Sequence, residues 1–236
     1  MIPENPLLPL CPDGWIVPQL VNAYKLRPDS LIECDDQGAL LHFSKGFYLI
    51  HQPDQKTAAL WLEKAHEMDP ITLLFASGSE SMKPALESPL LSLENASACH
   101  EYIWTKKEKP VLNGSLSFKP ASLEDYGWIR ERYDLADDQE LKETLENERL
   151  FLAYDHENHL VGYGGMHSEG SMGMLEIFSD FRRKGYGAQF EKFLCGWFMD
   201  EGLIPFCHVF DDNTASQKMN EEIGMEETDH PVWWIF

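Results

Sequence analysis

The most constraining feature of this sequence is a basic, glycine-containing segment between two apolar stretches. The segment reads Arg182-Arg183-Lys184-Gly185-Tyr186-Gly187-Ala188. A strand-like apolar run, Met172–Phe178, precedes it, and apolar residues at helical spacing follow it as far as Phe198. Gly202 has the place of a helix-ending glycine. The pattern predicts a strand, a tight turn and a helix in direct succession.

The turn itself has the chemistry of an anion-binding site. Gly185 and Gly187 allow backbone amides to approach a ligand closely. A helix start offers unpaired N–H groups and about half a positive charge. Three consecutive cations reinforce that charge in a chain that holds only 19 basic residues. The alternative is a plain turn with solvated basic side chains.

The surrounding patterns predict an α+β (mixed α/β) fold, with a mixed sheet flanked by helices on both faces. Asp155–Asn158 is a polar turn between two apolar runs and predicts an antiparallel hairpin. Ser122, with Asp125 three residues later, predicts a helix start close to a capping box. The last strand, 232–236, is expected to pair with 225–228. Further strands are expected at 116–118, 150–154, 160–167 and 204–210, and further helices at 138–147 and 213–224.

The chain of 236 residues is long enough for one large domain or two small ones. A polar segment, 105–110, suggests a connection, so we place a boundary near Asn113. Domain 1–113 is expected to be a smaller α/β half with strands at 40–43, 47–51 and 72–75 and a helix at 55–68. Domain 114–236 holds the anion-binding turn.

Charge and cysteine usage exclude several classes of function. The net charge of -21 argues against nucleic acid and anionic membrane surfaces as partners. The acidity either keeps the protein soluble or attracts cationic amines. No apolar run approaches the ~18 residues of a membrane span. The scattered cysteines favour a cytoplasmic protein with neither a disulfide framework nor a metal site; they are Cys11, Cys34, Cys99, Cys195 and Cys207.

Two motifs together resemble the GNAT superfamily of N-acyltransferases. The basic turn is similar to the family's (Q/R)-x-x-G-x-(G/A) loop. Residues 212–216 through 222–225 are similar to its N-x-x-(A/S)…G-(F/M) segment. The resemblance covers about 114–236. Segment 204–209 favours a resemblance to the glycine N-acyltransferase-like branch, in which a divergent N-terminal half precedes this domain. That half would shape the acceptor pocket.

The resemblance implies an acetyltransferase that uses acetyl-CoA as cosubstrate and acylates an amine of a small molecule or peptide. Strand residues 174–179 would line the pantetheine, and amides of 183–188 would hold the pyrophosphate. Asn213 would bond the pantetheine arm or fix the splayed strands, although the N-cap of a helix is its plain alternative. The implied CoA-binding residues are Ile177, Phe178, Ser179, Arg182, Arg183, Lys184, Gly185, Tyr186, Gly187, Ala188, Asn213 and Ser216.

Two departures from the family pattern bear on catalysis. The position of the family's tyrosine acid holds Asn220, and the position of its glutamate base holds Ser171. We predict Glu176 as the general base, in an apolar setting and turned by a strand bulge. Glu169, His167 or a water near Ser171 are the alternatives. The missing acid and base also leave open a catalytically inactive CoA-binding module with a regulatory or interaction role.

Overall fold

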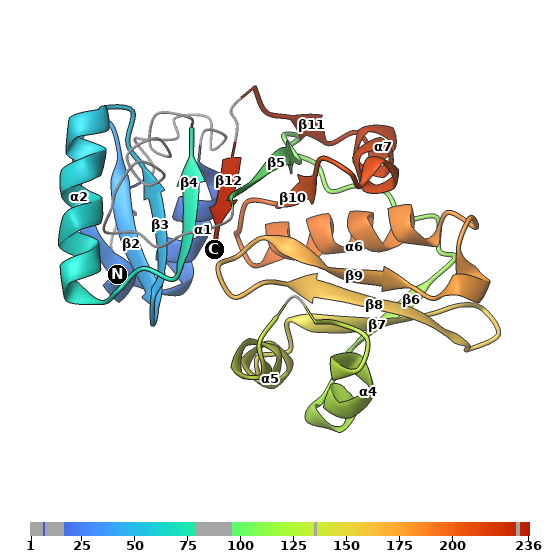
Figure 1. Cartoon of the computed structure of the whole chain (residues 1–236). Helices are drawn as coiled ribbons and strands as arrows, with labels where there is room; N and C mark the ends of the chain where they lie inside the picture. The colour runs from blue at the N-terminus through green and yellow to red at the C-terminus, as the bar shows by residue number, and fades with distance from the viewer. Residues whose placement is uncertain (1–6, 8–16, 79–95, 135, 230–231) are drawn as a thin grey trace. The chain divides into compact units, whose positions relative to one another are not determined.

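The structure is a computed structural model that describes residues 7, 17–78, 96–134, 136–229 and 232–236 (Figure 1). Its contacts divide the chain into two compact units. Unit 1 comprises Met1–Ile103, His208–Gln217 and Glu226–Phe236, and unit 2 comprises Trp104–Cys207 and Lys218–Met225. The predicted boundary near Asn113 therefore lies inside unit 2, and the C-terminal part of the chain contributes to both units.

Unit 2 is built on an antiparallel sheet in the order β6-β7-β8-β9. Its strands are β6 (Ser117–Pro120), β7 (Leu150–Tyr154), β8 (Leu160–Met166) and β9 (Met172–Ile177). The predicted hairpin at 155–158 is confirmed, because Tyr154 pairs with Leu160 across that turn. Asp155 stabilises the turn by accepting the N–H groups of Glu157 and His159 at 3.0 and 2.9 Å.

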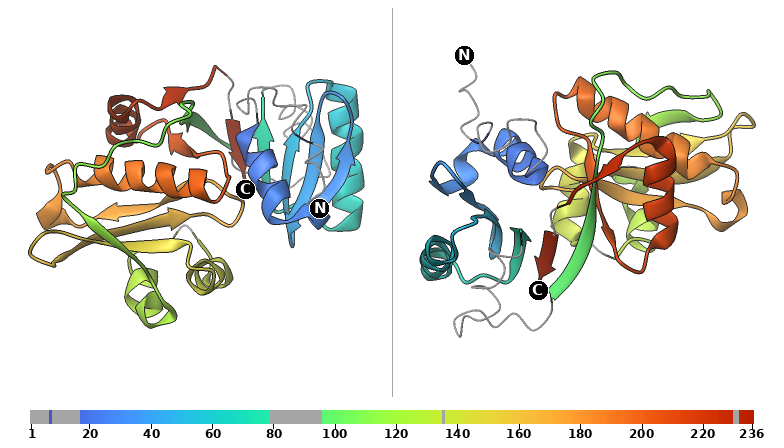
Figure 2. Two further views of the ribbon diagram at one scale, coloured as in Figure 1. Left: turned by 180° about the vertical axis from the view of Figure 1, so that it is seen from behind. Right: turned by 90° about the horizontal axis from the view of Figure 1, so that it is seen from above.

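Helices cover both faces of this sheet, as predicted (Figures 1 and 2). On one face, α4 (Tyr126–Arg130) and α5 (Asp138–Glu146) bury Ile129, Leu141 and Leu145 against the three strands that follow them. On the other face, α6 (Tyr186–Asp200) places Phe193 against Phe118 and Phe151. The sheet is thereby a packed middle layer whose end, at β9, leads into α6.

Local signals at the helix ends are also confirmed. Ser122 and Asp125 form the capping box, which starts a short 3-10 helix, η3 (Leu123–Asp125), directly before α4. Gly202 follows the end of α6 with a left-handed φ of 66°. Glycine adopts this conformation without the steric cost that a side chain would add.

Unit 1 contains all of the second sheet except the first two residues of β10, in the order β1-β2-β3-β4-β12-β5-β10, with β11 also paired to β5. The pair β3–β4 is parallel and joined by α2, whereas β1–β2, β2–β3 and β4–β12 are antiparallel, so this sheet is mixed. Its strands are β1 (Leu31–Cys34), β2 (Ala39–Ser44), β3 (Phe47–His51), β4 (Leu73–Ser77), β5 (Ala96–Ile103), β10 (Phe206–Phe210), β11 (Glu226–Glu227) and β12 (Val232–Ile235). Its helices are α1 (Pro18–Leu26), η2 (Pro28–Ser30), α2 (Gln55–Met68) and the start of α7 (Thr214–Ile223).

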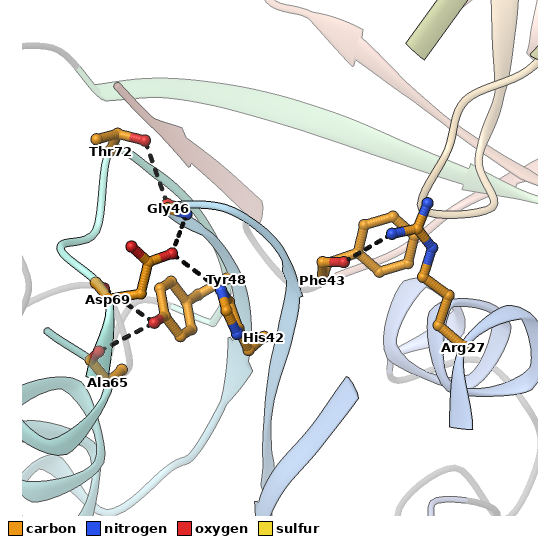
Figure 3. Close-up of polar contacts among 8 residues, drawn as sticks. All are labelled: Arg27, His42, Phe43, Gly46, Tyr48, Ala65, Asp69 and Thr72. Atoms are coloured by element: carbon orange, nitrogen blue, oxygen red, sulfur yellow. Dashed lines mark hydrogen bonds and ion pairs between the residues drawn. The ribbon is translucent and has the colours of Figure 1, made fainter. Parts of the chain in front are cut away.

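The end of α2 is fixed to the β2–β3 turn by a small polar network (Figure 3). Buried Tyr48 donates to the carbonyls of Ala65 and Asp69 at 3.0 and 2.9 Å. The Asp69 carboxylate accepts the N–H of Gly46 at 2.5 Å and contacts His42 at 3.1 Å. Because each of these groups finds a partner within unit 1, the network accounts for His42 as a structural residue.

The pairing predicted for the terminal strand is wrong. β12 pairs with β4 on one side and with β5 on the other, where Val232 lies opposite Cys99. β11 pairs instead with the far end of β5, where Glu226 lies opposite Ile103. The two segments therefore share β5 as a neighbour. A buried strand such as β12 gains two hydrogen-bonded neighbours in this way, which a simple terminal hairpin would not give it.

Candidate functional site

The basic turn has the strand-turn-helix geometry that the sequence predicts. After β9, a 3-10 turn, η4 (Ser179–Phe181), leads to Arg182, whose Nε donates to the Ile177 carbonyl at 2.8 Å. The backbone is left-handed at Arg183 (φ 61°) and again at Gly185 (φ 77°), immediately before α6 begins. These two reversals bring the chain sharply from the strand into the helix.

The start of α6 presents amides and positive charge together. The first helical bond runs from Gln189 N to the Gly185 carbonyl at 3.2 Å, so the N–H groups of Tyr186, Gly187 and Ala188 precede the helical ladder. Arg182, Arg183 and Lys184 are exposed next to them. Amides, helix dipole and cations therefore favour one anionic group at this place.

A side chain at Gly187 would crowd its neighbours. A Cβ at this position would lie 3.0 Å from the Met219 sulfur and 3.8 Å from Ile177 Cγ1. Among the described residues, no atom beyond the glycine and its chain neighbours lies within 4 Å of a Cβ built on Gly185. At that position the left-handed backbone, and not a lack of space, favours glycine. The residues fit a diphosphate-bearing ligand such as CoA, because a phosphate can approach the amides only where no side chain covers them.

Strand β9 offers two further features to a ligand. Among the described strands of its sheet it lies at the edge, so one side of its backbone is not paired within that sheet. It also contains the expected bulge: Glu176 pairs with Tyr163 and Gly173 with Gly165, which leaves an extra residue in β9, and Met174 has a φ of 52°. A bulge interrupts the ladder and re-aims the neighbouring groups.

Glu176 lies beside a cation, which corrects its expected apolar setting. Its Oε1 accepts Arg132 Nη1 at 3.3 Å, and the Arg132 guanidinium stacks over the Phe178 ring at 4.6 Å. Burial and a hydrogen bond with Glu176 raise the pKa of Tyr163. Glu176 is thus held between a cation and a phenol. Its other oxygen, Oε2, is buried without a hydrogen-bond partner among the described residues.

Glu169 and Ser171 come together in the β8–β9 hairpin. Glu169 is only 4% exposed, and the Ser171 hydroxyl donates to its Oε1 at 2.5 Å. Ser171 occupies the position of the family's base. The carboxylate nearest to that position is therefore Glu169, to which the serine is hydrogen-bonded. His167 starts the same hairpin, and its backbone N–H donates to the Ser171 carbonyl at 2.9 Å.

The structure adds two residues that the sequence pattern did not single out. Glu140 of α5 places Oε1 3.4 Å from His167 Nδ1, and the Tyr133 hydroxyl lies 3.4 Å from His167 Nε2. Polar atoms of Glu140, His167 and Glu169 all lie within 4.8 Å of one another, so the three side chains form one cluster. Glu140 and Tyr133 carry no motif of their own, and only their packing brings them to His167.

The downstream motif has structural partners of its own. Asn213 and Ser216 belong to unit 1, where Asn213 Oδ1 caps α7 by accepting the Ser216 N–H at 3.2 Å. The N-cap alternative is therefore confirmed, and contacts of Asn213 and Ser216 with CoA stay predictions. Asn220 is fully buried, and its amide donates to the Cys207 sulfur at 3.3 Å. Asn220 thus supplies no acid.

His208 and the cysteines are structural residues. His208 is a core histidine, since its side chain is 8% exposed and its Nε2 lies 3.1 Å from buried Glu101. The cysteines within the described ranges, Cys34, Cys99, Cys195 and Cys207, are all free, while Cys11 lies outside those ranges. None of the helices described has both the length and the apolar character of a membrane span.

Comparisons with known proteins identify a family from the sequence and a fold from solved structures. Residues 91–225, more than half of the chain, match the model of the acetyltransferase (GNAT) family. A solved structure of a Drosophila protein is 12% identical and covers 93% of this chain and 89% of its own, with a TM-score of 0.62. No curated protein sequence matches the chain.

Two further solved structures have the same fold. A GCN5-related N-acetyltransferase from Kribbella flavida is 11% identical, covers 94% of this chain and 96% of its own, and has a TM-score of 0.56. An acetyltransferase of the GNAT family from Colwellia psychrerythraea is 16% identical, covers 94% and 96%, and has a TM-score of 0.51. At these identities the likeness is one of fold, and it extends over both halves of the chain.

Proposed function

Because the chain belongs to the acetyltransferase (GNAT) family, we propose that it transfers an acetyl group from acetyl-CoA to an amine of a small molecule or peptide. The observation that carries the proposal is the start of α6. There Arg182, Arg183 and Lys184 are exposed beside the first-turn amides, and Gly187 leaves those amides uncovered. The CoA pyrophosphate has the charge and the shape that this turn favours.

The pantetheine arm is assigned to the edge of β9. An amide-containing chain can pair with an open strand edge as another strand would. The arm would follow Met174–Ser179, with Ile177, Phe178 and Ser179 closest to the turn. In this position the thioester would lie near the bulge at Met174. The residue added by a bulge leaves backbone groups without ladder partners, and one such N–H would stabilise the tetrahedral oxyanion.

The reaction follows from this arrangement as a direct attack. The amine nitrogen forms a bond to the thioester carbonyl carbon, and the C–S bond then breaks to release CoA. An ammonium acceptor must first lose a proton, because its lone pair is otherwise occupied. Glu176, predicted from the sequence, and Glu169, joined to Ser171, are two carboxylates of unit 2 for this role. The net charge of -21 would attract a cationic acceptor.

The second candidate function is a CoA-binding module without catalysis. It is favoured by Asn220, which is buried against Cys207 in place of an acid, and by Ser171 in place of a base. Both candidates bind CoA at the same turn. Only release of free CoA thiol separates them. The glycine N-acyltransferase-like branch, a cytoplasmic location and a role of residues 1–113 in the acceptor pocket are further parts of the proposal.

The deciding experiment measures thiol release from acetyl-CoA with a panel of amines. We expect amine-dependent release with at least one of glycine, spermidine, phenethylamine and a lysine-containing peptide. Glycine would favour the glycine N-acyltransferase-like branch, and spermidine would favour charge attraction. CoA binding by calorimetry without release from any amine would instead establish the binding module.

A further inference from the structure

The His167 ring packs against β9 at Gly173, a position where only a glycine leaves room for it. The hairpin 167–171 brings the ring back over Gly173, where a Cβ would lie 2.4 Å from Nε2 and 2.5 Å from Cδ2. Contacts that short do not occur between real Cβ atoms and a ring, so any side chain at 173 would displace His167. The imidazole therefore lies one residue from the bulge at Met174, where the thioester is proposed to bind.

Acidic groups surround this imidazole from two elements. Glu140 of α5 lies against Nδ1, and buried Glu169 lies in the hairpin itself. Burial alone would lower the pKa of His167, but the contact with Glu140 and the charge of Glu169 outweigh it and raise the pKa above its ordinary value. Conversely, burial would raise the pKa of Glu140, but His167 and the Ser168 N–H lower it below the usual range. The two side chains stabilise each other's charged forms.

The opposite ring nitrogen is less firmly held. Nε2 faces the Tyr133 hydroxyl at 3.4 Å, which is longer than an ordinary hydrogen bond. Burial and the nearby carboxylates raise the pKa of Tyr133, so this hydroxyl keeps its proton. The His167 side chain is 24% exposed, which leaves part of the ring open. One nitrogen is thus oriented by a carboxylate, while the other has only a long contact with Tyr133 among the described residues, the arrangement of a histidine base.

We propose that His167 takes the proton from the acceptor ammonium, and that Glu140 positions it and stabilises the resulting imidazolium. The inference rests on the proposed acetyltransferase function. An N–H bond of the ammonium breaks, the proton binds Nε2, and the electron pair left on nitrogen forms the bond to the carbonyl carbon. As the C–S bond breaks, the nitrogen loses a second proton, and the departing CoA sulfur takes up that proton to become a thiol. His167 then releases its proton to water.

This assignment accounts for the departures from the family pattern. Glu176 has Arg132 as a partner at 3.3 Å, and Glu169 accepts the Ser171 hydroxyl within the protein interior. Each carboxylate thus has one oxygen in a contact within the protein, and Oε2 of Glu176 is buried without a hydrogen-bond partner in the described part of the chain. His167 instead has a nitrogen whose contact is already long, beside carboxylates that favour its protonated form. Glu169 then contributes its charge and holds the hairpin through Ser171.

The first test compares three variants in the thiol-release assay, with the best amine of the panel. His167→Gln should lower turnover by roughly 10²–10⁴-fold, the range for general-base catalysis, while CoA affinity stays unchanged. His159→Gln, the same change at an exposed turn of unit 2, should keep normal turnover. Near-normal turnover in His167→Gln would overturn the proposal. A loss of that size in Glu176→Gln, with His167→Gln near normal, would return the role to Glu176.

The second test is a pH profile, which a purely structural role would not move. In the unaltered protein kcat/KM should rise with pH as His167 loses its proton. Glu140→Gln removes the charge that favours imidazolium, so the acidic limb should move to lower pH. A limb that stays in place would contradict the assignment, as would activity lost in EDTA and restored by Zn²⁺ or Mn²⁺. If the unaltered protein releases no thiol with any amine, the proposed function fails and this inference fails with it.

Discussion

A Gly187→Trp variant should lose CoA affinity by roughly 10²–10³-fold, because the indole would cover the amides that hold the pyrophosphate. Losing two charge-assisted hydrogen bonds costs about 3–4 kcal/mol, and each 1.4 kcal/mol is about tenfold in affinity. The side chain cannot turn inward freely, since its Cβ alone would lie 3.0 Å from the Met219 sulfur. Isothermal titration with CoA measures the change, and the unaltered chain should bind one CoA.

Gly196→Trp is the matched control for this change. Gly196 lies in the same helix, and a Cβ there would meet only the Lys109 side chain, at 3.9 Å. This variant should bind CoA normally, and circular dichroism should show that both variants are folded. Unaltered affinity in Gly187→Trp, or two equivalent CoA sites in the unaltered chain, would contradict the assignment of the turn.

Glu191→Gln should remove a pH dependence of stability that the unaltered protein shows. Glu191 is 4% exposed on the inner side of α6, and burial raises its pKa from 4.5 to about 7, although a hydrogen bond with Cys207 lowers it slightly. The folded chain therefore keeps a proton that the unfolded chain loses above pH 4.5. This contribution to stability is present at low pH and is lost as the pH rises through about 7.

The expected size follows from the same shift. Between pH 5 and pH 9 the unaltered chain should lose about 2–3 kcal/mol of unfolding free energy through Glu191, and the glutamine variant should not. Urea or thermal unfolding at several pH values measures this difference. Glu201→Gln, at the exposed end of the same helix, serves as the control and should follow the unaltered protein. Parallel pH curves for Glu191→Gln and the unaltered chain would show that Glu191 is ionised throughout.

If both the turn and His167 act as proposed, donor binding and proton removal depend on different parts of unit 2. The start of α6 binds the donor, and the β8–β9 hairpin with α5 handles the acceptor's proton. A Gly187→Trp protein should then fail at binding, whereas a His167→Gln protein should bind CoA and fail at turnover. This separation lets calorimetry and thiol release assign each defect to one of the two places.

Sequence reasoning predicted the features that depend on neighbouring residues. The turn 182–188, the hairpin at 155–158, the capping box of Ser122 and the helix end at Gly202 were all predicted correctly. Each depends on backbone conformations and hydrogen bonds among residues a few positions apart, which residue type controls directly. The anion-binding character of the turn follows from the same short segment, whereas the binding of CoA by its individual residues stays a prediction.

Tertiary structure alone decided the contacts between distant segments. Glu176 meets Arg132 across 44 positions, His167 meets Glu140 across 27, and β12 pairs with β4 and β5 instead of β11. Such contacts depend on how α4 and α5 pack against the sheet and on which strand edges remain open, and no local pattern encodes either. A residue's type shows that it can carry a proton. Only the packed neighbours, here Glu140 at one nitrogen and Gly173 beneath the ring, decide which residue is placed to do so.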